Sequence, residues 1–295
     1  MKKRVVPCDK LSNHPFNMPA DTYAFFLQGN TALKCVESVN NGKKIITPYW
    51  LELAEGYFDL SPLNSFDREV LFALISAYEQ GFRVGTISTT LDALTGGSEK
   101  RHVYKEQYAA IKQAIDKLSC TRIKVDLAPL FKAMPKYQEN YTGKAELVGM
   151  LLPCRYLEAE INGQESLTIE LLGESPLMTV AKLKKQVMTY DATPLAIAGQ
   201  YNSPTVITVK NWLLRRIHSI NRGLNSSILL NTLYDECGLA DADNGKKRDV
   251  RKIITDILFS FKEDGVIQDF EFQKQDKIYR TIKITPIKNK RHKRN

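Results

Sequence analysis

Apolar residues near the end of the chain recur at the spacing of a helix. Val250, Ile253, Ile254, Ile257, Leu258 and Phe261 follow one another at steps of three or one, so they share one face. The residues between them are largely polar, and a glycine at position 265 ends the pattern. The spacing predicts a long amphipathic helix that opens within Lys246-Lys247-Arg248-Asp249-Val250.

Two alternating segments follow this helix. Val266–Phe272 and Ile278–Ile284 read as strands on either side of a polar turn at 273–277. Two shorter helices are predicted before it. One contains Trp212 and Ile217, and the other is capped by Ser226 or Ser227 and closes near position 238.

The middle of the chain repeats this order. Ser65 is predicted to cap a helix that ends near Gly81, and a short strand follows at 84–87. A small helix over Leu91–Leu94 comes next, and Glu99–Val103 opens a long one. The face of that long helix is made of Tyr104, Tyr108, Ile111, Ile115 and Leu118.

Strands are predicted after the long helix of this first copy. One is expected at 121–127. A pair at 156–161 and 166–172 is joined by Asn162-Gly163, a strong signal for a two-residue hairpin turn. Helix, helix, basic-headed helix and hairpin therefore occur twice, which predicts an α+β fold of two tandem winged-helix domains, a helix-turn-helix variant, related by an internal pseudo-repeat. Independent convergence on the same pattern is the alternative.

The repeat suggests a division of the chain. The expected segments are an N-terminal arm of unknown role (1–60), a first winged-helix domain (61–175), a connection (176–205), a second winged-helix domain (206–287) and a basic tail (288–295).

Positive charge is concentrated at the C-terminal end. The chain has a formal net charge of +9, and residues 246–295 hold 15 Lys or Arg against 7 Asp or Glu. A basic end on a near-neutral body indicates a polyanionic partner. A simply solvated tail is the alternative for residues 288–295. Residues 182–185, with three lysines, are expected to be solvated or to touch DNA.

The position of the cations points to duplex DNA. Basic residues open both long helices, although a helix start prefers acidic ones, and an approaching phosphate would reverse that penalty. In a helix-turn-helix these residues meet the base edges. The predicted DNA-binding residues are Lys246, Lys247, Arg248, Arg251, Lys252, Lys274, Lys277, Arg280, Lys100, Arg101 and Lys105.

These residues have different expected roles. Arg248 and Arg251 lie off the apolar stripe and can face the groove, where arginine pairs with guanine. The turn residues Lys274, Lys277 and Arg280 are assigned to phosphates or the minor groove, with ordinary turn polarity as the equal alternative.

Catalytic and metal-binding patterns are not found. The glycines at 96–97 lack the spacing of a phosphate loop, and the four histidines and five cysteines form no metal-ligand cluster. We therefore expect no enzymatic activity, no cofactor and no metal. There is no apolar run of membrane-spanning length and no disulfide spacing, so a cytoplasmic protein without a membrane partner is expected.

Two segments and the basic-headed helices resemble a known family. Leu63-Asn64-Ser65-Phe66-Asp67-Arg68-Glu69-Val70-Leu71 and Glu170-Leu171-Leu172-Gly173-Glu174-Ser175-Pro176-Leu177 are similar to plasmid replication initiator (Rep) proteins with two winged helices, over roughly 60–285. The resemblance implies sequence-specific binding to repeated origin sites (iterons), recruitment of host replication proteins, and a homodimer in some states. It also implies that the first winged-helix domain (61–175) serves dimerisation or auxiliary DNA contact and that the second (206–287) makes the main DNA contact.

Two other functions fit the same fold. A transcriptional repressor would use the same winged helices on a promoter, and an adaptor would use them to bind proteins instead of DNA. The charge pattern favours a nucleic-acid partner, but the choice between initiator and repressor rests on the resemblance.

Overall fold

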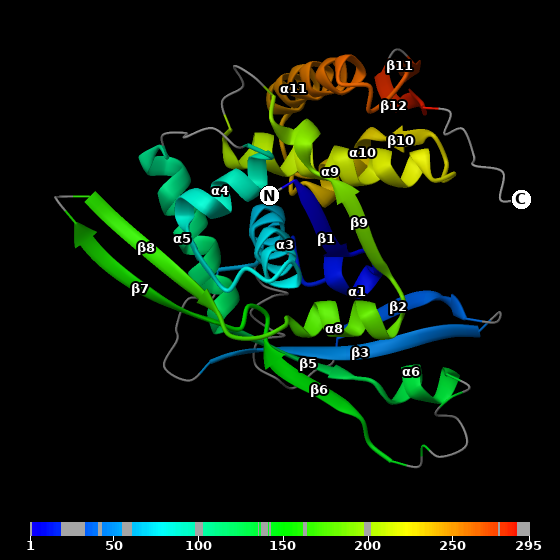
Figure 1. The fold of residues 1–295 in the computed structure, drawn as a ribbon. Coiled ribbons are helices and arrows are strands. Elements are labelled where there is room, and N and C mark those ends of the chain that lie inside the picture. The colour runs from blue at the N-terminus through cyan, green and yellow to red at the C-terminus, as the bar shows by residue number, and fades with distance from the viewer. Residues whose placement is uncertain are drawn as a thin grey trace, which may run out of the picture. The chain divides into compact units, whose positions relative to one another are not determined.

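Helices and strands alternate along the chain, which is a mixed α+β protein (Figure 1). The computed structural model describes residues 2–18, 33–40, 43–54, 61–97, 103–134, 136, 141, 143–161, 164–197, 202–276 and 278–287, with no side chains for 33–44, 161 and 164. The chain divides into two compact units. The N-terminal unit contains Arg4–Leu91 and Arg101–Thr189, and the C-terminal unit contains Met1–Lys3, Asp92–Lys100 and Tyr190–Asn295.

The central helix of the N-terminal unit is α3 (Ser65–Glu79), which is buried along most of its length. Asn64, not the predicted Ser65, caps it. The Asn64 side chain accepts from the backbone N–H of Asp67 at 3.0 Å, and the Asp67 carboxylate accepts from the backbone N–H of Asn64 at 2.9 Å. This reciprocal pair is a capping box. The helix ends near Gly81, as predicted, and Gly81 has a left-handed φ of 87°.

A four-stranded antiparallel sheet covers part of this unit. Its order is β2 (Leu33–Asn40), β3 (Lys43–Leu53), β5 (Thr121–Asp126) and β6 (Glu146–Met150). Leu51 of β3 lies opposite Ile123 of β5, and both side chains are fully buried. The strand predicted at 121–127 therefore pairs with residues that were set apart as an N-terminal arm.

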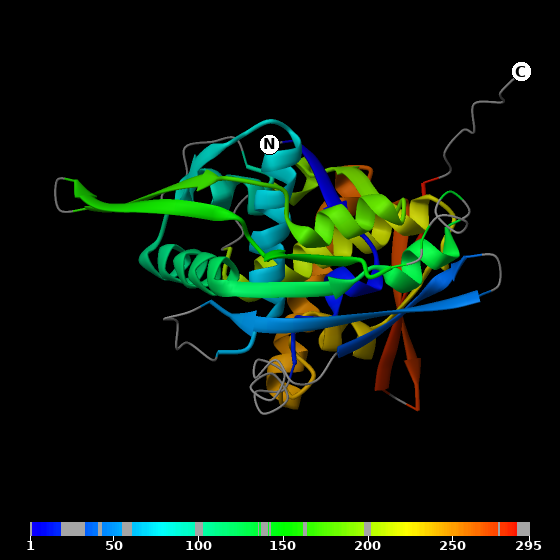
Figure 2. The ribbon, with the colours of Figure 1, turned by 90° about the horizontal axis from the view of Figure 1, so that it is seen from below.

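A second sheet contains the predicted hairpin. Its order is β4 (Val84–Thr86), β8 (Gln164–Leu171) and β7 (Cys154–Ile161). Figures 1 and 2 both show β7 and β8 side by side as an extended hairpin. The innermost pair is Ile161 with Gln164, and the predicted turn residues 162 and 163 lie outside the described part of the chain.

Two helices follow β4 directly in the chain. They are α4 (Ile87–Thr95) and α5 (Lys105–Cys120). The long helix was predicted to open at 99–103, but Val103 is not helical and α5 begins at Lys105. Ile111, Ile115 and Leu118 are fully buried as predicted, whereas Tyr104, at the N-cap, is half exposed.

Several shorter elements lie outside the two repeated sets and the four-stranded sheet. Strands β1 (Lys3–Pro7) and β9 (Val187–Asp191) pair with each other. The remaining helices are α1 (Lys10–Asn13), α6 (Ala128–Ala133), α8 (Pro176–Leu183) and the 3-10 turn η1 (Thr193–Leu195).

The C-terminal unit is built from three helices and a three-stranded sheet. The helices are α9 (Pro204–Asn221), α10 (Leu230–Glu236) and α11 (Asn244–Glu263). The sheet has the order β10 (Ser227–Leu229), β12 (Ile278–Thr285) and β11 (Asp269–Gln275). The prediction that Ser226 or Ser227 caps α10 is wrong. Ser227 lies in β10 and pairs with Lys283, and the N-cap of α10 is Leu229.

The same order of elements occurs in both halves of the chain. Helix, strand, helix, helix and hairpin are α3, β4, α4, α5 and β7–β8 in one case, and α9, β10, α10, α11 and β11–β12 in the other. Each sheet places its short strand beside the second strand of the hairpin. The first copy differs by the insertion of β5, α6 and β6 between its last helix and its hairpin.

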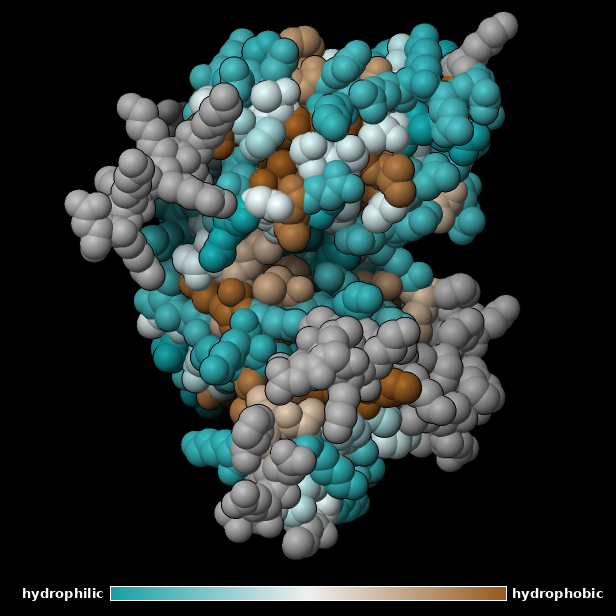
Figure 3. All heavy atoms as spheres, turned by 90° about the vertical axis from the view of Figure 1, so that its right-hand side faces the viewer, coloured by the Kyte–Doolittle hydropathy of each residue, from teal (hydrophilic) through white to brown (hydrophobic). Residues whose placement is uncertain are grey.

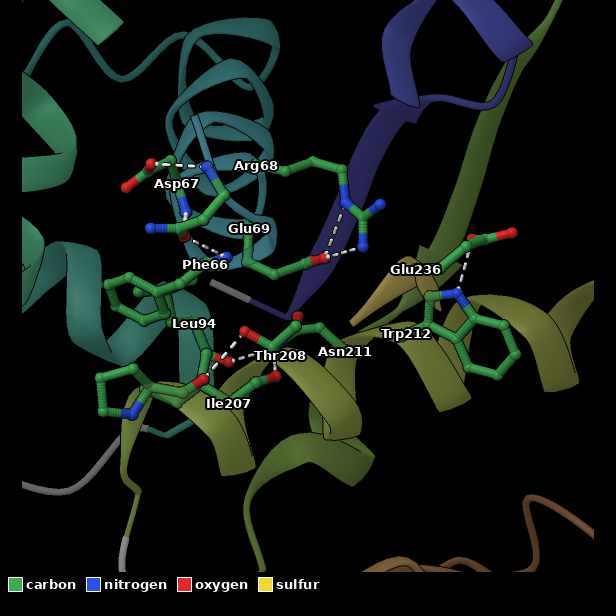
Figure 4. A network of polar contacts seen from close by, with 12 residues as sticks. Phe66, Asp67, Arg68, Glu69, Leu94, Ile207, Thr208, Asn211, Trp212 and Glu236 are labelled. Carbon is green, nitrogen blue, oxygen red and sulfur yellow. Dashed lines mark hydrogen bonds and ion pairs between the residues drawn. The ribbon is translucent and has the colours of Figure 1, made fainter. Parts of the chain in front are cut away.

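Buried polar contacts fix the start of α9 and a neighbouring segment of the C-terminal unit. The Asn211 side chain donates to the carbonyl of Leu94 at 2.8 Å and to that of Ile207 at 2.9 Å (Figure 4). Further along α9, the indole N–H of Trp212 donates to Glu236 at 2.7 Å. These bonds join α9 to the end of α4 and to α10. They help to fix the positions of the helices that pack with α11 in the C-terminal unit.

Large apolar side chains are mostly buried. Those that are exposed are dispersed over several elements, and Leu157 and Val84 are examples. On the face shown in Figure 3, hydrophilic residues predominate among those that are coloured, and hydrophobic ones form small patches. This face is therefore mainly polar, which directs attention to the polar and basic residues.

Candidate nucleic-acid interface

The basic start of α11 is capped by an acidic residue. Asp243 is the N-cap, and its carboxylate accepts a hydrogen bond from the backbone N–H of Lys246 at 2.7 Å. The first turn of the helix contains no other acidic residue. The Asp243 carboxylate therefore partly offsets the unfavourable interaction between the cations and the helix dipole. The helix dipole consequently gives weaker support for a bound phosphate at this position than the sequence suggested.

The cations that follow the cap differ in their partners. The Lys247 ammonium donates to the carbonyl of Ala240 at 2.8 Å and lies 5.8 Å from the ring centre of Tyr234. Lys247 thus holds the loop before α11. Arg248 and Lys252 are about 70 % exposed and each lies 3.9 Å from Asp249. Exposed pairs at this distance are weak, so both cations are available to a partner.

Core packing sets which face of α11 is exposed. Of the predicted stripe, Val250, Ile254, Ile257, Leu258 and Phe261 are buried, whereas Ile253 is only half-buried. Gly265, with a left-handed φ of 67°, follows the end of the helix. Because this stripe packs inward, the side chains between its members face outward.

The β11–β12 hairpin is irregular near its tip. Gln273 pairs with Thr281, but the next residue, Lys274, pairs with Tyr279, so Arg280 is an extra residue on β12. Such a β-bulge turns the side chains beyond it to the opposite face of the strand. Tyr279 consequently lies beside Phe272, with ring centres 6.0 Å apart.

Aromatic rings connect this hairpin to α11. Phe259 of α11 contacts Phe270 of β11 edge to face at 5.1 Å, and Phe270 contacts Phe272 at 6.0 Å. Tyr279 continues the row at its far end. Edge-to-face packing of this kind stabilises a fixed approach of two elements. The hairpin is therefore held against the helix along a line of four rings.

Two predicted DNA-binding residues meet at the end of this row. The Arg251 guanidinium lies 6.0 Å from the ring centre of Tyr279, and the Lys274 ammonium lies 4.6 Å from it. Arg251 comes from α11 and Lys274 from β11. The structure thus brings these two predicted residues together around Tyr279, which the sequence reasoning did not select.

Other cations of the C-terminal unit have acidic partners. The Lys262 ammonium, at the end of α11, donates to the Asp269 carboxylate at 2.8 Å and holds the pKa of Asp269 below its usual value. Arg280 is exposed on the bulge. The predicted DNA-binding cations of this unit that the structure describes therefore lie at the start of α11 and on the β11–β12 hairpin.

The remaining predicted residues are dispersed. Lys105 is the exposed first residue of α5 in the N-terminal unit. Lys100, Arg101 and Lys277 lie outside the described residues, as does the tail 288–295. The basic residues predicted to open the long helix of the first copy, Lys100 and Arg101, therefore lie outside the described part of the chain.

Two of the three lysines at 182–185 have acidic partners. Lys184 is buried and binds Asp9 at 2.7 Å, and Lys182 binds both Glu79 and Glu174. Neither reading from the sequence, solvation or DNA contact, describes Lys184. Its role is to join the segment after α8 to the cap of α1.

Metal sites and membrane spans were also considered. Within the described ranges, no three His, Cys, Asp or Glu side chains gather in a way that would hold a metal ion. No helix in that part of the chain is long and apolar enough to cross a membrane.

Comparison with known proteins gives limited matches. No family model matches the chain, and no curated protein matches it significantly. Two solved structures resemble it: a selenomethionine derivative of domains 2 and 3 of RctB, at 13 % identity over 91 % of this chain and 98 % of that one, and RctB domains 2-3, at 12 % identity over 87 % and 91 %. Both have a TM-score of 0.42. A TM-score of this size does not by itself establish a shared fold.

Proposed function

We propose that the chain is a non-enzymatic protein that binds double-stranded DNA through α11 and the β11–β12 hairpin, with each half of the repeat acting as a winged helix. The observation that carries this proposal is the cationic start of α11 beside a hairpin whose tip is also cationic. In a winged helix the recognition helix lies in the major groove and the hairpin contacts the adjacent backbone.

The roles within this surface follow from position. Arg248 is exposed near the start of α11, where a guanidinium can reach base edges and pair with guanine. Lys274 is on the hairpin and carries a flexible point charge that suits phosphate. We therefore assign sequence preference to Arg248 and general affinity to Lys274.

We further propose that the DNA is a plasmid origin with repeated sites, and that the chain initiates replication there with host proteins, as a monomer or a homodimer. This step is supported by the resemblance of residues 63–71 and 170–177 to Rep proteins. A repressor of the same fold would bind similar operators without supporting replication.

A salt titration tests the DNA-binding step. The affinity for a duplex should fall steeply as salt rises, because each neutralised phosphate releases bound counterions, with a slope of about −0.9 per phosphate contact on a logarithmic scale. An affinity independent of salt would contradict the phosphate contacts and favour the adaptor.

Two substitutions test the division of roles. Arg248→Ala should cost about 1–3 kcal/mol on a specific site and less on random DNA, whereas Lys274→Ala should weaken both similarly. Equal losses on both DNAs for both variants would refute the assignment.

Transformation with the gene and its flanking DNA on an otherwise origin-less plasmid then separates initiator from repressor, since only an initiator sustains the plasmid.

A further inference from the structure

Tyr279 is a partly exposed aromatic residue at the end of the row of rings, near two cations. The residue is 41 % exposed, yet its ring contacts Phe272 and lies within 6.0 Å of the cationic groups of both Arg251 and Lys274. The bulge at Arg280 is what turns it to this face. The β-bulge at Arg280 thus places one aromatic ring near two positive charges.

The two cations come from different elements. Arg251 is in the second turn of α11, and Lys274 is the residue of β11 beside the bulge. Long cationic side chains on a surface sample many rotamers, and ordering them on a partner costs conformational entropy. A ring that attracts both restricts them before a partner arrives.

We propose that Tyr279 is a positioning residue that preorganises Arg251 and Lys274 to bind neighbouring phosphates of one DNA strand. This inference rests on the proposed function, because it names how that same surface engages the backbone. The Phe259–Phe270–Phe272 row anchors the ring, so the position of both charges is fixed relative to α11. Tyr279 acts through the two cations and makes no base contact of its own.

The experiment compares Tyr279→Leu with Tyr279→Phe in the full chain. Leucine removes the ring and phenylalanine retains it. Duplex affinity is measured by fluorescence anisotropy on random-sequence DNA between 50 and 300 mM salt, at about five concentrations that bracket physiological ionic strength. Tyr279→Leu should bind about threefold to tenfold more weakly, with a salt slope shallower by about one, and Tyr279→Phe should match the parent chain.

A double-mutant cycle distinguishes positioning from a merely structural role. If Tyr279 acts through the cations, Tyr279→Leu should have little effect in a chain that already carries Arg251→Ala and Lys274→Ala. A full loss in that background would overturn the inference. Far-UV circular dichroism and urea unfolding of each variant show whether the fold is retained.

The outcomes separate this inference from the proposed function. If the parent chain shows no salt-dependent duplex binding, both fail. If it binds, and Lys274→Ala weakens binding while Tyr279→Leu changes neither affinity nor slope, only the role of Tyr279 is refuted. If Tyr279→Leu unfolds, Tyr279→Met, which also lacks a ring, takes its place: weaker binding by Tyr279→Met than by Tyr279→Phe supports the role of the ring, and equal affinities for these two variants overturn it.

Discussion

Asp243 combines two opposing effects at the start of α11. Its carboxylate caps the helix by accepting from the backbone N–H of Lys246, yet it places a negative charge beside the proposed DNA-binding cations. Asp243→Ala removes the cap and should lower the free energy of unfolding by about 1 kcal/mol. Urea denaturation followed by circular dichroism measures this. Asp243→Asn keeps the capping oxygen, so its stability should remain close to that of the parent chain.

The same position allows a test of its charge alone. Asp243→Asn removes one negative charge next to Lys246 and Arg248 while the helix remains capped. On the proposed function, duplex DNA should bind about twofold to fivefold more tightly, with the largest gain at low salt. Anisotropy titrations at two salt concentrations measure the change. Weaker binding by Asp243→Asn would show that the carboxylate assists recognition.

Single-residue features were the hardest to predict from the sequence. Ser65 and Asn64 are both good caps, and only the reciprocal bond with Asp67 decides between them. Ser227 has the composition of a cap but pairs with Lys283 in a sheet. Tyr279 was missed because a bulge, which no local pattern reveals, sets the face on which it lies. Each choice depends on partners that are distant or geometrically specific.

At the scale of elements, the burial of the α11 stripe predicts that substitutions at neighbouring positions reduce stability by different amounts. Ile254 is fully buried, whereas its neighbour Ile253 is only half-buried. Ile254→Ala should reduce the free energy of unfolding by about 2–5 kcal/mol, because it leaves a cavity among packed side chains. Ile253→Ala is the matched control and should cost clearly less. Equal losses would mean that the stripe does not set the packing face of α11.

Amphipathic helices and hairpins were predictable because their signals are local. The α11 stripe lies as the spacing indicated, and β7 and β8 form the predicted pair. The start of α5 was wrong by several residues, since Glu99–Val103 has no capping signal to set a boundary. The three-residue strand β10 was missed because it is too short for an alternating pattern and is defined by its pairing with β12.

At the scale of the whole molecule, contacts between segments far apart in the sequence decide the organisation. β3 pairs with β5, about seventy residues later, and the segment Asp92–Lys100 belongs with Tyr190–Asn295. The bond from Asn211 to Leu94 is one cause of the second association. Contacts over such separations leave no periodic trace in the sequence. The discontinuous units therefore follow from packing that only the folded chain displays.

One histidine in each unit gives the protein an expected sensitivity to mild acid. His14 in the N-terminal unit contacts the Tyr49 hydroxyl at 2.7 Å, and burial lowers its pKa. His218 in the C-terminal unit has a pKa lowered by burial and then by the charge of Arg222. Its Nε2 atom is buried without a hydrogen-bond partner among the described residues. Both imidazoles are thus disfavoured as cations in the folded state.

The sign of the pH effect follows from this. Below the unfolded value of 6.5, the unfolded chain binds protons that the folded chain does not, so the free energy of unfolding should fall as the pH drops from about 6.5. Urea unfolding at pH 7.5, 6.5 and 5.5 measures it, in a range that lies above ordinary carboxylate titration at about pH 4. His14→Gln with His218→Gln should flatten the dependence, because glutamine cannot titrate. An unchanged slope in that double variant would assign the acid sensitivity to other groups.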